Sequence, residues 1–337
     1  FYGSHPQFIL CSATIANPKE LAETLTGREV ILVDDNGAPM GVRHFVFYNP
    51  PVVNRQLGIR KGVLQETRRI AGLLLQNGIQ AITFARSRLA VEVLTKYLKD
   101  MVRDPLGNAG RVRGYRGGYL PTERREIERG LRAGRVDAVV STNALELGID
   151  IGGLDVCILV GYPGTIMSTL QRGGRVGRAQ QESAVVLVAG EDALDQYFMS
   201  HPEDFFSRPA EKAVVNPWNE VILARHLECA AAELPLSARD PWLAPAPAQE
   251  ALRDLAAQGR LLLSADGSQW LAARKRPQRL VDLRGTGRSF VIEDSEGTVI
   301  GSVDGFRAWR ETHVGAVYLH RGRSYVIEEM DPAAGRV

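Results

Sequence analysis

From residue 63 to residue 200, short apolar runs alternate with segments whose apolar residues recur at helical spacing. The apolar runs are AITF (81–84), VRGY (112–115), VDAVV (136–140), DVCILV (155–160) and SAVVLVA (183–189). The intervals predict helices over about 87–102, after Pro121 and over about 165–173. Apolar strands that alternate with helices are typical of a parallel sheet covered by helices on both faces. We therefore predict an α/β domain over residues 51–200.

The segment before this domain also contains apolar runs. FILCSAT (8–14) predicts the last core strand of a separate, mostly missing domain, followed by a helix from Pro18. EVILVD (29–34) and RHFVFY (43–48) predict two further strands that lead into the next domain. We assign residues 1–50 to the remnant of that separate domain and to a linker.

The pattern changes after residue 200. Helical spacing over 219–236 and 247–260 precedes a hairpin over 260–273, whose Asp-Gly pair predicts a tight turn. Two helices followed by a hairpin indicate a winged-helix-like domain, which we place at 201–283. Short strands between glycine-containing turns predict a small β domain at 284–337, either a barrel-like fold or a sheet appendage.

Composition adds little to this assignment. The chain has 337 residues, an apolar content of 45% and a net charge of +2, which point to packed domains without indicating a particular partner. Its basic residues are mostly arginine, which reflects either phosphate recognition or a GC-rich coding sequence. Three cysteines stand far apart in apolar segments, and we expect buried reduced thiols and no metal site. Because these thiols are expected to be reduced, we expect a cytoplasmic protein. The sequence shows no apolar stretch long enough to cross a membrane, and its first residues do not resemble a cleavable leader.

Polar residues and glycines follow the predicted strands in sequence order. The four segments are FARSR (84–88), RGGY (116–119), STNALELGIDI (141–151) and QRGGRVGR (171–178). Arginine offers a planar fork that binds phosphate oxygens in pairs, and glycine lets the backbone approach closely. Together these loops predict a phosphate-binding edge of the sheet.

These segments resemble motifs of the superfamily-two helicases of the DEAD/DEAH-box type. SAT (12–14) is similar to motif III, TFARSR to motif IV, STNALELGID to motif V and QRGGRVGR to motif VI. The resemblance implies that residues 51–200 form the second RecA-like domain and that residues 1–50 include the end of the first. Residues 193–236 and 315–331 resemble the YprA/MrfA-type DNA helicase branch, in which a cysteine-rich zinc module is expected further on.

The resemblance implies a role for each nucleotide-facing residue. Arg175 and Arg178 correspond to the catalytic motif VI arginines that reach the γ-phosphate of ATP, with Arg178 as the arginine finger. Gly148, Asp150 and Gln171 are the further expected ATP-binding residues. For Arg172 and Glu146 we favour structural roles, with Arg172 holding the loop or contacting motif V.

The same resemblance implies a track for one nucleic-acid strand. Its expected members are Arg86, Ser87, Gly118, Tyr119, Thr142 and Asn143, which would contact the sugar-phosphate backbone without reading sequence. For Tyr119, packing beneath its loop is the alternative. Ser12 and Thr14 in motif III are expected to couple nucleotide state to strand binding.

The phosphate loop G-x-x-x-x-G-K-[ST] and an Asp-Glu pair do not occur in the sequence. We therefore expect the phosphate cradle and the Mg²⁺ ligands upstream of Phe1 in a longer polypeptide, and no ATP hydrolysis by this chain alone. The expected partners are ATP and single-stranded or partly duplex DNA, without a membrane. An RNA helicase, a duplex translocase or a nucleic-acid-binding scaffold without ATPase activity remain alternatives.

Overall fold

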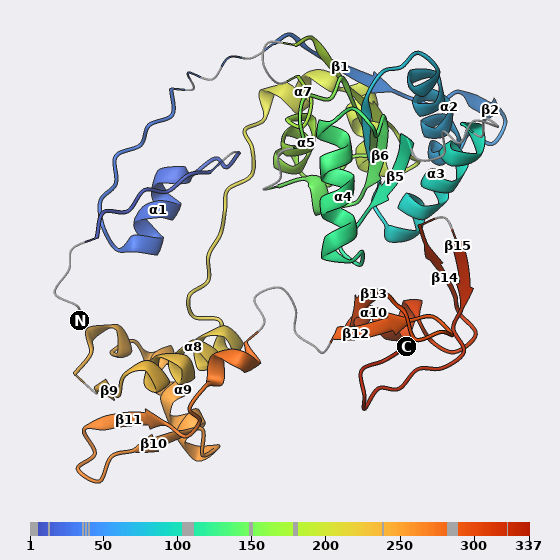
Figure 1. Ribbon diagram of the computed structural model, residues 1–337. Coiled ribbons are helices and arrows are strands. Elements are labelled where there is room, and N and C mark those ends of the chain that lie inside the picture. Colours follow the sequence, from blue (N-terminus) through green and yellow to red (C-terminus); the bar gives the residue numbers. More distant parts are fainter. Residues whose placement is uncertain are drawn as a thin grey trace. The chain divides into compact units, whose positions relative to one another are not determined.

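The computed structural model describes residues 6–12, 14–35, 37, 39, 41–102, 111–147, 151–177, 181–237, 239–281, 289–321 and 323–337. The chain forms two compact units, which are Phe1–Ala213 with Arg288–Val337, and Val214–Gly287. Figure 1 follows the chain through its helices and strands. The first unit holds the sheet on which the candidate site is built.

A six-stranded sheet forms the centre of the first unit, in the order β1-β8-β7-β4-β6-β5. Every neighbouring pair in it is parallel. The strands are β1 (Arg43–Tyr48), β4 (Ala81–Phe84), β5 (Val112–Tyr115), β6 (Ala138–Ser141), β7 (Val156–Val160) and β8 (Ser183–Val188). The predicted parallel α/β fold is thereby confirmed.

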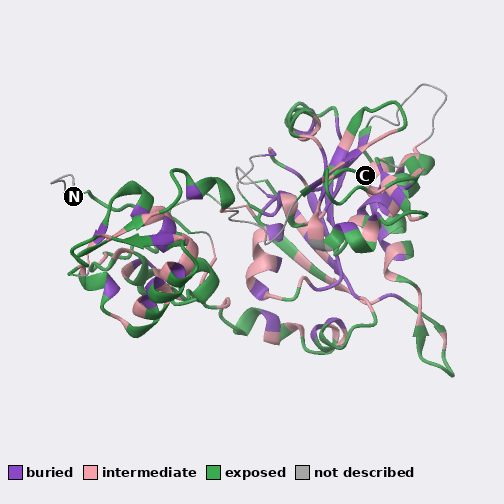
Figure 2. Cartoon of the chain, turned by 90° about the horizontal axis from the view of Figure 1, so that it is seen from below, coloured by how far each residue is buried: buried purple, intermediate pink, exposed green. Residues whose placement is uncertain are grey.

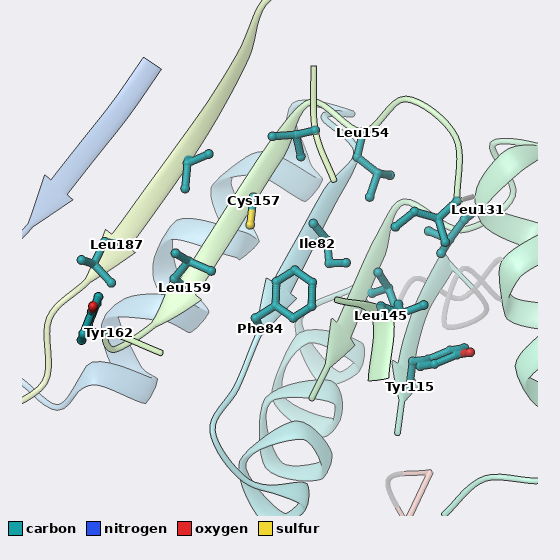
Figure 3. Close-up of a cluster of buried hydrophobic side chains, with 14 of the residues drawn as sticks. Ile82, Phe84, Tyr115, Leu131, Leu145, Leu154, Cys157, Leu159, Tyr162 and Leu187 are labelled. Atoms are coloured by element: carbon teal, nitrogen blue, oxygen red, sulfur yellow. The ribbon is translucent and has the colours of Figure 1, made fainter. Parts of the chain in front are cut away.

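Both faces of the sheet are buried because side chains alternate between them along each strand. In β7, Cys157 and Leu159 enter one apolar cluster, whereas Val156 and Ile158 enter the other. Figure 3 shows the first cluster, in which Ile82 and Phe84 of β4 lie beside Leu159. Figure 2 shows the buried residues concentrated along these strands. Burial on both faces explains why the strands read as continuous apolar runs.

Helices cover each face with an apolar stripe. Ala71 of α2 (Val63–Gln76) and Leu94 of α3 (Arg88–Met101) belong to the cluster on one face. The other face is covered by α4 (Pro121–Arg132), α5 (Ile166–Gly173), α6 (Ala193–Ser200) and α7 (Pro202–Ser207), which contribute residues to the first cluster. The predicted helices lie within one or two residues of these bounds.

The N-terminal segment differs from its prediction. The helix from Pro18 is present as α1 (Pro18–Thr26), but the described residues of 8–14 and 29–34 contain no strand. Cys11 is exposed, contrary to the expected burial, because no neighbouring strand covers its segment. RHFVFY does form a strand, β1, and it pairs with β8. The sheet therefore begins before residue 51, where the sequence predicted the start of this domain, and a short hairpin of β2 (Val52–Asn54) and β3 (Ile59–Arg60) follows β1.

The second unit has the predicted winged-helix organisation. Its helices are α8 (Glu220–Glu233) and α9 (Ala246–Ala257), and its three-stranded sheet contains β9 (Leu236–Ser237), β10 (Leu261–Leu263) and β11 (Gln269–Ala272). Short 3₁₀ helices, η3 (Pro241–Leu243) and η4 (Pro277–Leu280), accompany them. Leu227, Leu252 and Leu261 meet in one buried core. This shared core packs the two helices against the β10–β11 hairpin, as the apolar spacing predicted.

The C-terminal segment is a small β domain, but its described residues do not close a barrel. They form two antiparallel pairs, β12 (Ser289–Glu293) with β13 (Val299–Asp304), and β14 (Val317–His320) with β15 (Arg323–Val326). Helix α10 (Gly305–Glu311) joins the pairs, and Phe290, Val303 and Tyr318 lie in their shared core. Two hairpins around one short helix bury this core without a closed sheet.

Candidate phosphate-binding edge of the sheet

The residues predicted to bind nucleic acid follow the carboxyl ends of parallel strands, which share one edge of the sheet. Arg86 and Ser87 follow β4, Gly118 and Tyr119 follow β5, and the 3₁₀ helix η2 (Asn143–Leu145) follows β6. Gln171 is half-buried on α5. Gly148, Asp150 and Arg178 lie outside the described residues.

Glu146 joins the segment after β6 to α5. Its carboxylate accepts hydrogen bonds from Nε of Arg172 at 2.8 Å and from the hydroxyl of Ser168 at 2.5 Å. Its backbone carbonyl accepts from Nε of Arg175 at 3.0 Å and also from Nη2 of Arg175. One residue thus holds two arginines of QRGGRVGR through two different groups, and the expected contact of Arg172 with motif V is confirmed.

Both arginines are largely withdrawn from solvent. The residues Arg172 and Arg175 are each 9% exposed. The guanidinium carbon of Arg172 lies 5.4 Å from the centroid of the Phe84 ring, an aromatic contact that adds to its ion pair. A buried ion pair is stable only when its remaining donors and acceptors are satisfied, and Glu146 meets this need with Ser168. Hydrogen bonds and a buried ion pair therefore join the motif V segment to the motif VI segment.

Arg86 is held by a buried carboxylate that the sequence analysis did not identify. Its Nη2 lies 2.7 Å from Oδ1 of Asp195 and 2.7 Å from the carbonyl oxygen of Tyr162. Asp195 is fully buried, and it also accepts from the backbone N–H of Tyr162 at 2.9 Å and of Gly190 at 2.6 Å. This carboxylate ties together the loops that follow β4, β7 and β8.

Gly161 leaves room for the Arg86 guanidinium. Its φ is +76°, and a Cβ atom there would lie 2.7 Å from Nη2 of Arg86. The backbone conformation and this close approach together disfavour a side chain at this position. The Arg86 side chain remains 44% exposed, so part of its guanidinium faces solvent while the rest is fixed.

The hydroxyls after β4 and β6 cap the following helices. Ser87 accepts from the backbone N–H of Ala90 at 3.1 Å, and Thr142 accepts from that of Ala144 at 3.4 Å. Asn143 is exposed. Capping fixes the orientation of both loops.

The loop after β5 is covered by the C-terminal β domain. Arg116 is 1% exposed, with Nε 2.8 Å from Oε1 of Glu92 and Nη2 2.9 Å from the hydroxyl of Tyr318. The Tyr119 hydroxyl donates to the same Glu92 oxygen at 2.8 Å. Tyr119 is 3% exposed, so its ring packs beneath the loop, the alternative that the sequence left open.

Gly118 takes part in the same contact. Its carbonyl oxygen accepts from the N–H of Ser302 at 3.2 Å, and a Cβ atom on Gly118 would lie 3.0 Å from the carbonyl oxygen of Ser302. Gly118 is thereby buried between two backbone segments of the first unit.

The N-terminus of α5 binds a second unexpected carboxylate. Glu211 accepts from the backbone N–H groups of Ile166 and Met167, each at 2.8 Å. Burial opposes ionisation of Glu211, but these two N–H donors outweigh it and lower its pKa. Residues 16 and 17 hydrogen-bond to residues 211–213. They are close in sequence to the predicted coupling residues Ser12, which is exposed, and Thr14, which is half-buried.

Little in the sequence indicated the roles of the carboxylates of Asp195, Glu92 and Glu211. Asp195 stands between apolar and aromatic residues in ALDQYF, and an acid within an apolar helical stripe was the one available signal. Nothing local marks Glu92 or Arg116 as buried, or Glu211 as the acceptor at the N-terminus of α5. Within the described ranges, no group of three or more His, Cys, Asp or Glu is arranged to hold a metal ion. The helices described there also include none with the length and apolarity to cross a membrane.

Two protein families match separate parts of the chain. Residues 65–180 match the helicase conserved C-terminal domain, and residues 215–286 match the winged helix domain of the ATP-dependent helicase HRQ1. The first range contains the strands from β4 to β7 with α5, and the second contains most of the second unit.

Individual relatives extend over nearly the whole chain. The uncharacterized ATP-dependent helicase YprA of Bacillus subtilis is 47% identical over 98% of this chain and 44% of its own length. The ATP-dependent helicase HRQ1 of Saccharomyces cerevisiae is 33% identical over 97% of this chain and 31% of its own.

Among solved structures, the crystal structure of the DUF1998 helicase MrfA bound to DNA and AMPPNP is 46% identical, with a TM-score of 0.87 over 99% of this chain and 47% of that one. The chain thus spans less than half the length of each of these proteins. The matched domains and relatives agree with the motif order and the fold, and the chain belongs to the superfamily-two helicases, in the YprA/MrfA branch.

Proposed function

We propose that this chain is the C-terminal part of an ATP-dependent DNA helicase, in which it supplies the arginine finger and half of the nucleic-acid track. The observation that carries the proposal is the attachment of Arg172 and Arg175 to Glu146, because it connects the nucleotide-facing segment to the loop after β6. A shift of the arginines toward a phosphate would then move Thr142 and Asn143. The relative MrfA, whose structure contains DNA and AMPPNP, supports both ligands.

In this proposal, Arg175 and Arg178 are the catalytic residues, and Gly148, Asp150 and Gln171 complete the ATP-binding residues. ATP with Mg²⁺ supplies the phosphate whose developing charge the arginines stabilise. The arginines in the described residues fit a phosphate but not a metal ion, so we place the Mg²⁺ ligands elsewhere in the polypeptide. Ser12 and Thr14 remain the proposed coupling residues, and DNA repair in the cytoplasm is the proposed setting.

For the strand, we assign phosphate contacts to Arg86, Ser87, Thr142 and Asn143. The fixed but half-exposed guanidinium of Arg86 and the two capped helix ends support this assignment. Gly118 and Tyr119 are better assigned to packing against the C-terminal β domain, because both are buried.

The test of the nucleotide role is ATP turnover by the intact polypeptide with saturating single-stranded DNA. Arg178→Lys keeps the charge but loses the planar fork, so kcat should fall by about 10³-fold. Arg172→Lys, the matched control in the same segment, should be milder because Arg172 binds Glu146. A larger defect for Arg172→Lys, or normal turnover for Arg178→Lys, would overturn the assignment.

The test of the strand role is binding of a single-stranded DNA oligonucleotide by this chain across a range of salt concentrations. Arg86→Gln should weaken binding equally for all sequences and reduce the salt slope by about 0.7, the value for one phosphate contact. Arg310→Gln, an exposed arginine on α10, is the control. An unchanged slope for Arg86→Gln would contradict the track, and a matching RNA oligonucleotide compares the two nucleic acids.

A further inference from the structure

A cleft with a volume of about 520 Å³ lies between the outer edge of the sheet and the C-terminal hairpin. Its cations are Lys99 of α3, Arg113 of β5, and Arg321 and Arg323 at the turn of β14 and β15. β5 is the last strand of the sheet, and α3 contacts β14. Figure 1 shows β14 and β15 beside this end of the first unit. We call this site the cationic cleft.

Few of these charges are neutralised within the protein. Arg321 pairs with Glu123 at 2.6 Å, and Nζ of Lys99 reaches the carbonyl oxygen of Arg321 at 3.5 Å. Among the described residues, the guanidinium groups of Arg113 and Arg323 have neither a hydrogen bond nor an ion pair. Asp294 is the other acid in the lining. The cleft therefore keeps an excess of positive charge.

The crowding affects Lys99. Burial, together with Arg113, Arg321 and Arg323, lowers the pKa of its ammonium group, and Glu92 only partly opposes this. Like charges gathered in a partly buried cleft disfavour the empty state. A bound anion would remove this repulsion.

We propose that the cationic cleft binds the sugar-phosphate backbone of a nucleic-acid strand, at a site separate from the motif loops. Arginine forks favour phosphate oxygens, and the Tyr325 ring in the lining offers a face on which a base can stack. Leu120 and Glu123 place one end of the cleft directly after the carboxyl end of β5. The cleft would take a further part of the strand that the motif loops are proposed to bind, so this inference rests on the proposed function.

The test compares two double variants of this chain. Arg113→Gln with Arg323→Gln removes two cations that have no described protein partner, and Arg125→Gln with Arg310→Gln removes two exposed cations outside the cleft. Binding of a single-stranded DNA oligonucleotide is measured from low to high salt. The cleft variant should lower the salt slope by about 1.4, which is about 0.7 for each lost phosphate contact. The control variant should keep the slope, and thermal unfolding checks that both remain folded.

Inorganic phosphate serves as a second probe. An unchanged salt slope in the folded cleft variant would overturn the proposal even while the unsubstituted chain binds DNA normally. The same holds if the cleft variant loses only phosphate binding and keeps the slope, because the site would then take free phosphate. Absence of DNA binding by the unsubstituted chain would overturn the proposed track and this inference together. A reduced slope in the cleft variant with an intact Arg86 contribution supports the second site alone.

Discussion

Two groups of arginines in the first unit have opposite surroundings. Arg172 and Arg175 are buried and bonded to Glu146, whereas Arg113 and Arg323 line a cleft and have no ion pair among the described residues. Both groups lie in segments rich in arginine and glycine. Arg172 and Arg175 belong to QRGGRVGR, Arg113 belongs to VRGYRGG, and Arg323 belongs to HRGR. The sequence context alone therefore does not separate an arginine bonded to another residue of the protein from one whose side chain has no described partner.

The difference lies in the carboxylates. A buried acid from another element fixes an arginine, as Glu146, Asp195 and Glu92 do for Arg172, Arg86 and Arg116. Of these three, Arg86 is fixed and yet 44% exposed, which is why it is also proposed to contact a phosphate. Removing one member of such a pair leaves an uncompensated buried charge, which is costly. Removing an exposed arginine without a partner costs little stability but changes the electrostatic field.

The largest expected effect comes from breaking the most buried pair. Arg116→Met should lower the free energy of unfolding by about 3–5 kcal/mol, because Glu92 is left buried without its cation. Urea denaturation measures the change. Combining Arg116→Met with Glu92→Gln should restore part of the loss, and Arg113→Met nearby should change stability by less than about 0.5 kcal/mol. Equal losses for Arg116→Met and Arg113→Met would contradict the comparison.

A smaller loss of unfolding free energy is expected when Glu146, the motif V acid that binds the motif VI arginines, is replaced. Glu146→Ala deprives Arg172 and Ser168 of their acceptor and should cost about 2–3 kcal/mol. Glu146→Gln keeps an acceptor oxygen and should cost less. The Arg175 bond should survive both changes because it uses the backbone carbonyl. Identical stabilities of the two variants would show that the acceptor oxygen of Gln does not matter, and stabilities equal to that of the unsubstituted chain would show that the carboxylate does not matter at all.

The close packing of Gly161 against Arg86 predicts a further decrease in the free energy of unfolding. Gly161→Ala places a Cβ atom against the guanidinium at a positive φ, so we expect a loss of about 2 kcal/mol in unfolding free energy. Gly164→Ala is the control, because it also has a positive φ but a Cβ atom there meets no described atom within 4 Å. A loss for Gly164→Ala as large as that for Gly161→Ala would exclude the steric contribution of Arg86.

The smallest expected effect is a pH dependence at the C-terminal contact. Burial, with the charges of Arg116 and Arg321, lowers the pKa of His320 to about 3. Below about pH 6.5 the unfolded chain binds a proton at this histidine that the folded chain does not, so acidification disfavours folding. We expect a loss of about 1.5 kcal/mol from His320 between pH 6.5 and pH 5.

Thermal unfolding at several pH values measures this dependence. His320→Gln should flatten the curve over that range, whereas His313→Gln, which lies outside the arginine network, should leave its slope unchanged. A curve of the same slope in both variants would show that His320 does not contribute to the pH dependence.

The sequence by itself determined the elements and their order. Mainly apolar runs of four to seven residues predicted β4, β6, β7 and β8 to within about two residues, because a strand buried on both faces is largely apolar. The helices followed from their apolar spacing, and the motif order led to the family. The failures at 8–14 and 29–34 have one cause, because an apolar run becomes a strand only when another strand pairs with it.

The tertiary structure alone decided which polar side chains are bonded to other residues of the protein. Glu146 reaches Arg172 across 26 positions, Arg86 reaches Asp195 across 109, and Arg116 reaches Tyr318 across 202. These contacts bury Tyr119 and Gly118, fix Arg86, and leave Arg113 and Arg323 facing the cleft. Local patterns encode burial through periodicity, but an ion pair depends on which distant segments the fold brings within about 3 Å, a distance that no local spacing specifies.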